Sequence, residues 1–239
     1  MGIQLQLNEK YTFLEAETDE HRNEAYKLRF LVPCIDTGYR PDPTKKIETD
    51  RFDDISIHFL AYSKGIPIGA MRIVPENALK FPMEHPDFVN GQKYEGFPLD
   101  EYRREHDIEK AAEIGRLVVV DSERNHTPTI GFYKCVYECI NRMGIQHLFC
   151  VTKKVYAQMY AKLGFEQIGE EYPYPVRLDA TKLDSPAILD FFPLHLDKKN
   201  TDRIIGGETP NNQQIDVNLL KFLYSEWTDK QSTQNLLHR

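Results

Sequence analysis

The chain has 239 residues, enough for a sizeable hydrophobic core in one large domain or in one domain with an appendage. Its net charge of −7 argues against a nucleic-acid-binding protein that relies on a basic surface. No stretch approaches the roughly 18 to 20 apolar residues of a membrane-spanning helix, and the first ten residues do not resemble a signal peptide. We therefore expect a cytoplasmic protein with no transmembrane segment and no nucleic acid partner.

The first predicted helix covers residues 19–32, where apolar residues recur at helical spacing behind an acidic start, and it ends at Pro33. The next stretch, residues 36–51, holds prolines and mixed charge and is typical of a loop, long enough to fold over a site. Two apolar runs, residues 56–62 and 66–74, flank a short turn and predict a hairpin of strands.

Residues 75–111 contain prolines and glycines that interrupt any long element. The elements expected after them are strand 112–120, a helix capped by Thr127-Pro128 and ending at Gly144, strand 147–151, helix 155–163, and strands 165–168 and 172–178. Farther on, residues 200–214 predict a loop and residues 215–227 an amphipathic helix. We expect one domain over residues 1–180 and a C-terminal extension over residues 181–239 that packs on the same domain.

The four cysteines lack the paired spacing of a zinc site. Two of them, Cys135 and Cys139, lie four residues apart on an otherwise apolar helix face. We expect buried thiols rather than a zinc site or a disulfide framework, and no metal.

Two opposite charges, Glu113 and Arg116, lie in the first part of the apolar strand predicted over residues 112–120. A strand that enters a core normally carries no charge there. Upstream, Asp50 and Asp53 lie in the predicted loop, and Arg72 lies near the end of the second hairpin strand. Because charges are costly to bury unpaired, we expect these five side chains to converge at one end of a central sheet.

Several motifs carry a resemblance to a known family. The segment Tyr160-x-x-x-Gly164-Phe165 resembles a signature of the GNAT superfamily of N-acyltransferases. The set Arg29, Glu48-x-Asp50-x-Phe52-Asp53, Gly69-x-x-Arg72 and Glu113-x-x-Arg116 looks like the branch that contains acyl-homoserine-lactone (autoinducer) synthases and long-chain N-acyl amino acid synthases. Within that branch, Phe81-Pro82-Met83-Glu84 is similar to the PEP-CTERM/exosortase-associated acyltransferases. The resemblance implies an α/β, GNAT-like acyl-CoA N-acyltransferase fold with a central mixed twisted sheet flanked by helices.

Two departures from related enzymes bear on the substrates. Acyl-homoserine-lactone synthases carry a tryptophan between the first helix and the acidic motif, whereas residues 34–39 have none and the only tryptophan is Trp227. Residues 121–126 lack the glycine-rich loop that binds the coenzyme A pyrophosphate in ordinary GNAT enzymes. This favours a donor without adenosine diphosphate, such as acyl-phosphopantetheine on acyl carrier protein, and we expect no permanently bound cofactor.

Amide formation from a thioester needs an uncharged amine and a stabilised oxyanion. Glu113 is the candidate base for the ammonium proton, and the GNAT fold implies that the backbone N–H groups of Leu117, Val118 and Val119 polarise the carbonyl. The candidates for ordering the loop and binding the acceptor are Arg29, Asp50, Asp53 and Arg72, since arginine binds a carboxylate in bidentate geometry. Arg116 belongs to the same set and is, with Glu113, a candidate catalytic residue. The alternative is that these charges only neutralise one another.

Basic residues are candidates for contact with an acidic carrier protein, because complementary charge raises the encounter rate. They are Arg124, Lys153 and Lys154, with Lys134, Arg142 and Lys162 in support. The alternative is a solvated charged face. His58 on a strand and His126 in a loop are expected to be a structural and a solvated histidine.

The sequence thus predicts an N-acyltransferase that moves a medium- or long-chain fatty acyl group from acyl carrier protein to the amine of an amino acid or related small molecule. One alternative is an acyl-homoserine-lactone synthase that uses S-adenosylmethionine. Another is a non-catalytic lipid- or protein-binding module with the same fold.

Overall fold

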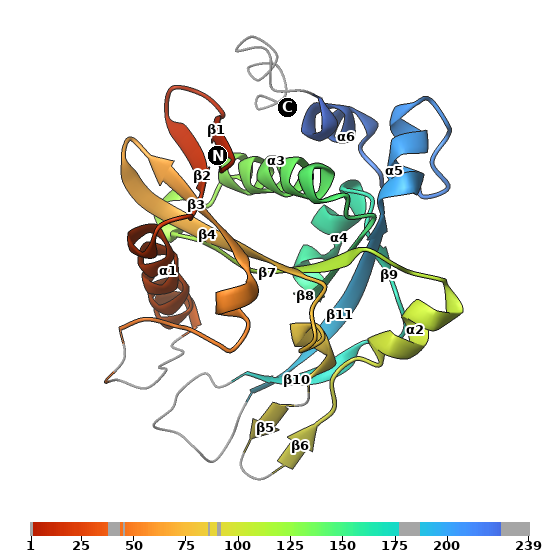
Figure 1. Ribbon diagram of the computed structural model, residues 1–239, viewed down its shortest axis with the longest axis horizontal. Coiled ribbons are helices and arrows are strands. Elements are labelled where there is room, and N and C mark those ends of the chain that lie inside the picture. Colours follow the sequence, from red (N-terminus) through yellow and green to blue (C-terminus); the bar gives the residue numbers. More distant parts are fainter. Residues whose placement is uncertain are drawn as a thin grey trace. The chain divides into compact units, whose positions relative to one another are not determined.

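The computed structural model describes residues 2–37, 44, 46–85, 87–89, 92–176 and 187–225 (Figure 1). These residues fall into two compact units. The first unit is built from Met1–Ile73, Gly115–Met143 and Leu223–Arg239, and the second from Val74–Ile114 and Gly144–Phe222. Two strands, β4 and β7, contribute residues to both units.

The first unit contains strands in the order β1-β2-β3-β4-β7, with antiparallel pairing from β1 to β4. They are β1 (Gln4–Gln6), β2 (Tyr11–Glu15), β3 (Ile57–Ser63), β4 (Ile66–Pro75) and β7 (Ala111–Val119). The helices of this unit are α1 (Asp19–Thr37) and α3 (His126–Met143), with short turns η1 (Asp53–Ile55) and η3 (Asp121–Glu123).

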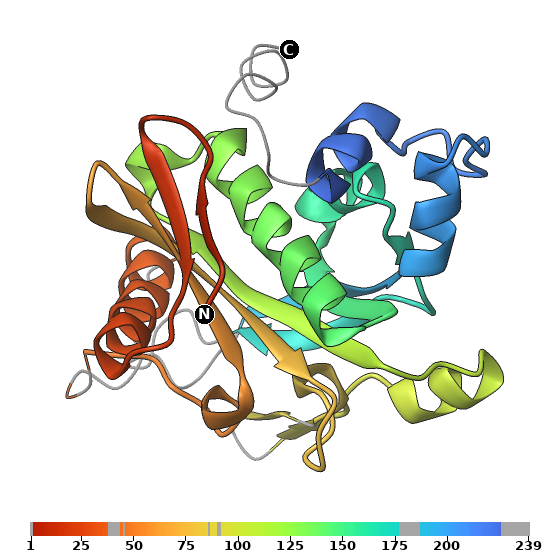
Figure 2. The same cartoon turned by 45° about the horizontal axis from the view of Figure 1, so that its top comes forward.

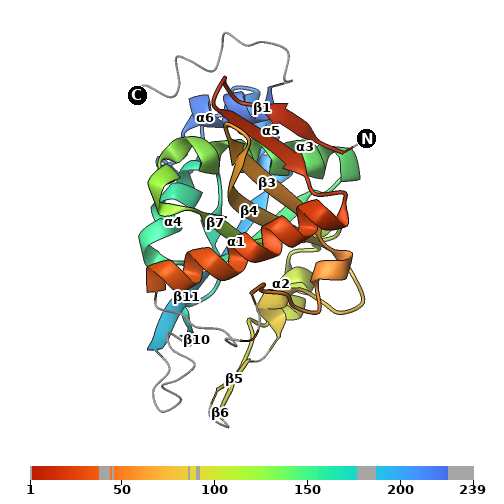
Figure 3. The ribbon, with the colours of Figure 1, turned by 90° about the vertical axis from the view of Figure 1, so that its left-hand side faces the viewer.

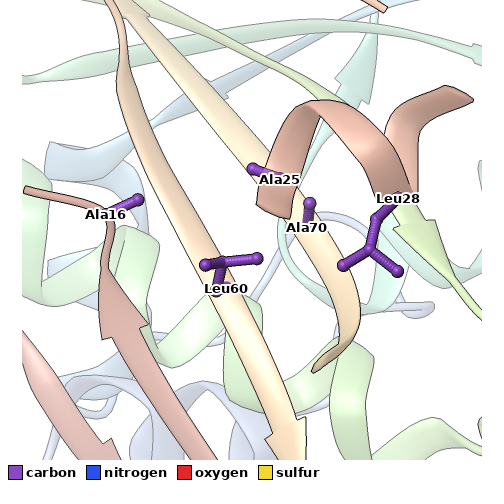
Figure 4. Close-up of a cluster of buried hydrophobic side chains, with 5 residues drawn as sticks. All are labelled: Ala16, Ala25, Leu28, Leu60 and Ala70. Carbon is purple, nitrogen blue, oxygen red and sulfur yellow. The ribbon is translucent and has the colours of Figure 1, made fainter. Parts of the chain in front are cut away.

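Helices α1 and α3 cover opposite faces of these strands, as Figures 2 and 3 show. On one face, Leu60 of β3 belongs to a buried apolar cluster with Ala25 and Leu28 of α1 (Figure 4). On the other face, Phe13 of β2 meets Phe132 of α3 edge to face, with 5.4 Å between ring centroids. The alternation of side chains along a strand produces this division, because Phe13 pairs with the residue after Leu60.

The second unit contains strands in the order β7-β8-β11-β10, and β9 also pairs with β11. The β7–β8 pair is parallel and the others are antiparallel, so the sheet is mixed. The strands after β7 are β8 (His147–Lys153), β9 (Glu166–Gln167), β10 (Tyr172–Val176) and β11 (Ala187–Asp197), while β5 (Asp87–Val89) and β6 (Gln92–Tyr94) form a separate hairpin. The helical segments are η2 (Pro82–Glu84), α2 (Leu99–Glu105), α4 (Lys154–Lys162), α5 (Lys198–Ile205) and α6 (Val217–Tyr224). The last two residues of α6 belong to the first unit.

The mixed sheet with flanking helices agrees with the predicted fold class, but several predicted element limits were wrong. Helix α1 continues through Pro33 to Thr37, because a proline removes one backbone donor without forbidding the next turn. The helix α3 begins at His126, and the side chain of Asn125, not Thr127, caps it by accepting the Thr127 N–H at 2.9 Å. Residues 75–111, expected to be irregular, include η2, α2 and the β5–β6 hairpin.

The described part of residues 181–239 does more than pack on a finished domain. Strand β11 pairs with β8 from Phe191 to Asp197 and with β10 from Ala187 to Phe191. Helix α5 begins inside the stretch expected to be a loop, and Ile204 of α5 packs with Leu220 of α6. Among the described residues, no helix is both long and apolar enough to cross a membrane.

Candidate active site

Glu113 lies on β7 in the second unit, opposite Phe149 of β8 in the parallel register. The residue is 4% exposed, and its Oε2 accepts a hydrogen bond from the backbone N–H of Met83 in η2 at 2.9 Å. An amide donor favours the ionised carboxylate, whereas burial alone favours the protonated form. Glu113 is therefore a buried carboxyl group held by a backbone donor, which is the chemistry expected of a general base.

A second polar group in this unit was not singled out from the sequence. His195 of β11 lies between two partners: the Tyr102 hydroxyl is 3.2 Å from Nδ1, and Nδ1 of His147 is 3.0 Å from Nε2. Burial lowers the pKa of His195 to about 4 and also lowers the pKa of His147, so both rings are neutral at pH 7. In the strand register Phe149 stands between His195 and Glu113, and its ring has no exchangeable proton. We therefore assign the histidines to the packing of α2 against β8 and β11.

In the first unit, two buried arginines share one buried aspartate. Arg29 of α1 donates to both oxygens of Asp53, at 2.6 and 3.3 Å. Arg72 of β4 donates to Asp53 Oδ1 at 2.7 Å. Arg29 follows Ala25 and Leu28 at helical spacing, which places it on the face of α1 that packs on the strands.

Three further residues, which are less deeply buried than Arg29, Asp53 and Arg72, complete this charge network. Asp50 accepts from Arg72 at 2.7 Å and from Arg116 at 3.0 Å. Glu48 pairs with Arg29 at 2.5 Å and with Arg116 at 3.2 Å. The Arg116 side chain is 43% exposed, against 20% for Glu48 and 23% for Asp50. Arg116 is the arginine of this network that a solute reaches most easily.

The protonation states follow from these contacts. Burial opposes ionisation of Asp50, but the hydrogen bond and charge of Arg72 and the charge of Arg116 outweigh it and hold the pKa of Asp50 well below 3.8. For Asp53, burial is outweighed in the same way by Arg29, so the pKa of Asp53 is also lowered. Burial opposes the charge on Arg29 as well, yet Glu48 and Asp53 raise the pKa of Arg29. The network thus sets three arginines against three acidic residues.

His58 borders this network without belonging to its charges. Its Nε2 lies 3.1 Å from the backbone oxygen of Asp53, and the residue is 2% exposed. Burial is the main cause that lowers the pKa of His58, so the ring is neutral. The contact fits the structural histidine expected from the sequence.

The backbone of Arg116 departs from the extended strand. Its φ of 54° lies in the left-handed region, which is unfavourable by about 1–2 kcal/mol for residues other than glycine. The ion pairs to Glu48 and Asp50 hold the side chain in this position. No sequence signal marks such a conformation at an arginine.

The structure thus brings together Arg29, Asp50, Asp53, Arg72 and Arg116 in one unit and places Glu113 in the other. Downstream on β7, Val118 packs against the apolar cluster of α1 and the Val119 carbonyl accepts from Arg124 Nε at 3.0 Å. The oxyanion role of the Leu117, Val118 and Val119 N–H groups stays a prediction.

The prediction that Lys134 belongs to an exposed basic face was wrong. Lys134 is 1% exposed, and its Nζ donates to the Leu223 carbonyl at 2.7 Å and to the Ser225 carbonyl, so it is not available to a carrier protein. Arg142 is taken up by two hydrogen bonds to Glu15, at 2.8 and 3.0 Å. Lys154 is exposed and Lys153 partly so, at the start of α4.

A cavity of about 480 Å³ lies in the second unit beside α2. Aromatic and other apolar residues line it together with five glutamates, namely Glu95, Glu101, Glu105, Glu170 and Glu171. Their negative charge disfavours a phosphate group there. The cavity therefore does not suit the phosphate of a phosphopantetheine arm.

A family model for the N-acyl amino acid synthase FeeM matches residues 34–181, more than half of the chain. A search of curated proteins finds no match.

Among solved structures, FeeM from uncultured soil microbes has a TM-score of 0.55 at 13% identity, covering 80% of this chain and 91% of FeeM. A putative N-acetyltransferase from Lactobacillus plantarum has a TM-score of 0.53 at 14% identity, covering 79% and 98%. The acyl-homoserine-lactone synthase LasI has a TM-score of 0.51 at 16% identity, covering 83% and 91%. At these identities the likeness establishes the fold, and the predicted GNAT-like fold is confirmed.

Proposed function

The chain belongs to the FeeM family of N-acyl amino acid synthases, and we propose that it moves a medium- or long-chain fatty acyl group from an acyl carrier protein thioester to the amine of an amino acid or related small molecule. Family membership supports an N-acyltransferase as the coarser assignment and disfavours a non-catalytic module. The donor and the acceptor are the finer parts of the proposal.

The buried position of Glu113, with its carboxylate held by a backbone N–H, is the observation that carries the proposal. The carboxylate takes a proton from the substrate ammonium, and the neutral amine attacks the thioester carbonyl. The tetrahedral oxyanion then collapses, the C–S bond breaks, and the nitrogen gives its surplus proton to the departing thiolate, which leaves as the thiol. Burial of Glu113 and its bond to the Met83 N–H support this role, because a base has to be ionised and held in place.

Arg116 is the proposed contact for the acceptor carboxylate. Arg29 and Arg72 are buried and share Asp53, whereas Arg116, which pairs with Glu48 and Asp50, keeps a side chain that is 43% exposed. The remaining members of the network order residues 46–56 against α1 and β4. Arg124, close to the start of α3, is the proposed contact for the donor phosphate.

Purified protein should be incubated with acyl carrier protein thioesters and an amino acid mixture, and the products read by mass spectrometry. We expect N-acyl amino acids, and we expect Glu113→Gln to lower kcat by a factor on the order of 10² or more while the fold is kept. The exposed Glu109 four residues upstream offers a matched control, Glu109→Gln, which should keep full activity. Formation of an acyl-homoserine lactone from S-adenosylmethionine would favour the alternative instead, and equal activity of both variants would remove Glu113 from its role.

A further inference from the structure

Residues 81–84 form a turn whose two ends are tied to each other. The backbone N–H of Phe81 donates to the Glu84 carboxylate at 2.8 Å, and the N–H of Glu84 donates to the Phe81 carbonyl at 3.0 Å. Pro82 occupies the first position of the turn, where its fixed φ suits the geometry and its missing N–H has no partner to lose. The backbone of the turn is therefore set by local bonds.

The third residue of this turn, Met83, forms backbone bonds in two directions. Its N–H donates to Glu113 at 2.9 Å, and its carbonyl accepts from the N–H of Phe97 at 2.8 Å. The Phe81 ring is 1% exposed and lies 6.3 Å from the ring of Phe149, the residue opposite Glu113 on β8. The turn is thus anchored in the core next to the strand pair that carries Glu113.

Gly96 permits this close approach. A Cβ built at position 96 would lie 2.3 Å from the carbonyl carbon and oxygen of Glu84, closer than any side chain allows. Any larger residue therefore has to push the turn away from the segment that contains Phe97.

We propose that the turn of residues 81–84 is a clamp that fixes the position of the Glu113 carboxylate and keeps it ionised, with Glu84 and Gly96 as positioning residues. The inference rests on the proposed role of Glu113 as the base. Burial of a carboxylate favours the neutral acid, and a backbone donor opposes that tendency. A buried general base near neutral pH needs such a donor, and Met83 supplies it only while the turn keeps its shape.

The hydrogen bond itself is testable without substrate. The chain has five methionines, so ¹⁵N-methionine labelling gives few amide signals, and Met83→Leu identifies the one from Met83. As pH is varied, we expect the chemical shift of the Met83 amide proton to report the titration of the Glu113 carboxyl group in the wild type. This pH-dependent change should be absent from Glu113→Gln. The same pH dependence in both proteins would overturn the clamp.

The positioning role is tested by a pair of variants at one residue. Glu84→Ala removes the acceptor that closes the turn, and we expect kcat to fall about tenfold because the base is displaced. We also expect the acid limb of the kcat/KM profile to move up by about one pH unit, since loss of the N–H donor favours protonated Glu113. Glu84→Gln keeps an oxygen acceptor and should stay close to the wild type. Gly96→Ala should repeat the effects of Glu84→Ala.

The results separate the clamp from the proposed function. Wild-type kcat and an unmoved profile in Glu84→Ala, while Glu113→Gln is inactive, would overturn the clamp and leave Glu113 as the base. An active Glu113→Gln whose Met83 amide no longer titrates would support the clamp as a device that holds the carboxylate and would reject the catalytic role.

Discussion

Asp53 is the residue on which the charge network of the first unit depends most. It is 4% exposed and accepts from Arg29, from Arg72 and from the backbone N–H of Asp50, the last at 2.7 Å. Both arginines are themselves buried. Removing one partner of a buried ion pair is costly because the other charge stays out of water.

We expect Asp53→Asn to lower the free energy of unfolding by roughly 3 kcal/mol at pH 7, since it leaves two buried guanidinium groups with one anion fewer. Urea denaturation measures the change. Asp54→Asn is the matched control, because Asp54 is exposed, and should change the stability by less than about 0.5 kcal/mol. Similar values for the two variants would mean that the network adds little to stability.

Acid should weaken the same network. The pKa values of Asp50 and Asp53 are lowered from 3.8 in the folded protein, so their stabilisation is complete above the unfolded value and is lost as pH falls through the folded values. We expect the wild-type unfolding free energy to drop below about pH 4 and the drop to be smaller in Asp53→Asn. A drop of equal size in both proteins would assign the acid sensitivity to other carboxyl groups.

The partners of a side chain could be predicted from the sequence where the side chain is charged, because burying an unpaired charge is costly. They were harder to predict elsewhere. The charges of Asp50, Asp53, Arg72 and Arg116 required partners, and they have one another. The bond from Met83 to Glu113 had no such signal, because any backbone amide can supply it.

Secondary structure was predictable where the apolar period was uninterrupted. In β11, residues 192, 194 and 196 are buried at the spacing of a strand, yet Pro193 and two aspartates obscure the pattern. Pro193 sits opposite Val151 of β8 inside the sheet. Burial of Lys134 on α3 was equally hidden, because it depends on carbonyls almost 90 residues away at Leu223. Long-range partners decide such cases.

The contact between α3 and β2 gives a prediction for a helix position. A Cβ at Gly131 would lie 2.0 Å from the Phe13 ring, so we expect Gly131→Ala to destabilise the protein by about 1–3 kcal/mol through overpacking. Helix propensity acts in the opposite direction by about 1 kcal/mol, and the clash outweighs it. Thermal unfolding against the control Asn141→Ala, on the exposed side of α3, separates the two effects. Stabilisation by both variants would show that the Phe13 ring moves aside at no cost.

At the scale of the whole molecule, the net charge of −7 repels an acidic partner at long range. Productive encounter with an acidic carrier protein then depends on local basic residues. Lys153 and Lys154 stand at the start of α4, next to Val155 and Tyr156, whose exposed fractions are 75% and 53%. Basic residues beside exposed apolar groups are more typical of a surface that binds another protein than of a surface that only contacts water.

The donor preference follows from this arrangement and from the missing glycine-rich loop at residues 121–126. We expect carrier-protein thioesters to be used much better than the matching coenzyme A thioesters, with the preference weakening as salt screens the contact. Reversing Lys153 and Lys154 together to Glu should raise the apparent KM for the carrier-bound donor and leave the acceptor KM largely unchanged.

A double reversal of the exposed Lys199 of α5 and Lys221 of α6 to Glu changes the net charge equally, in the same unit but on other helices than α4. If that control raises the donor KM as much as the α4 reversal, long-range repulsion alone explains the effect. If both donors have equal kcat/KM and neither reversal matters, the lysines of α4 are solvated surface and the missing loop does not select the donor. A selective loss in the α4 variant, absent at high salt, would instead assign the start of α4 to the carrier protein.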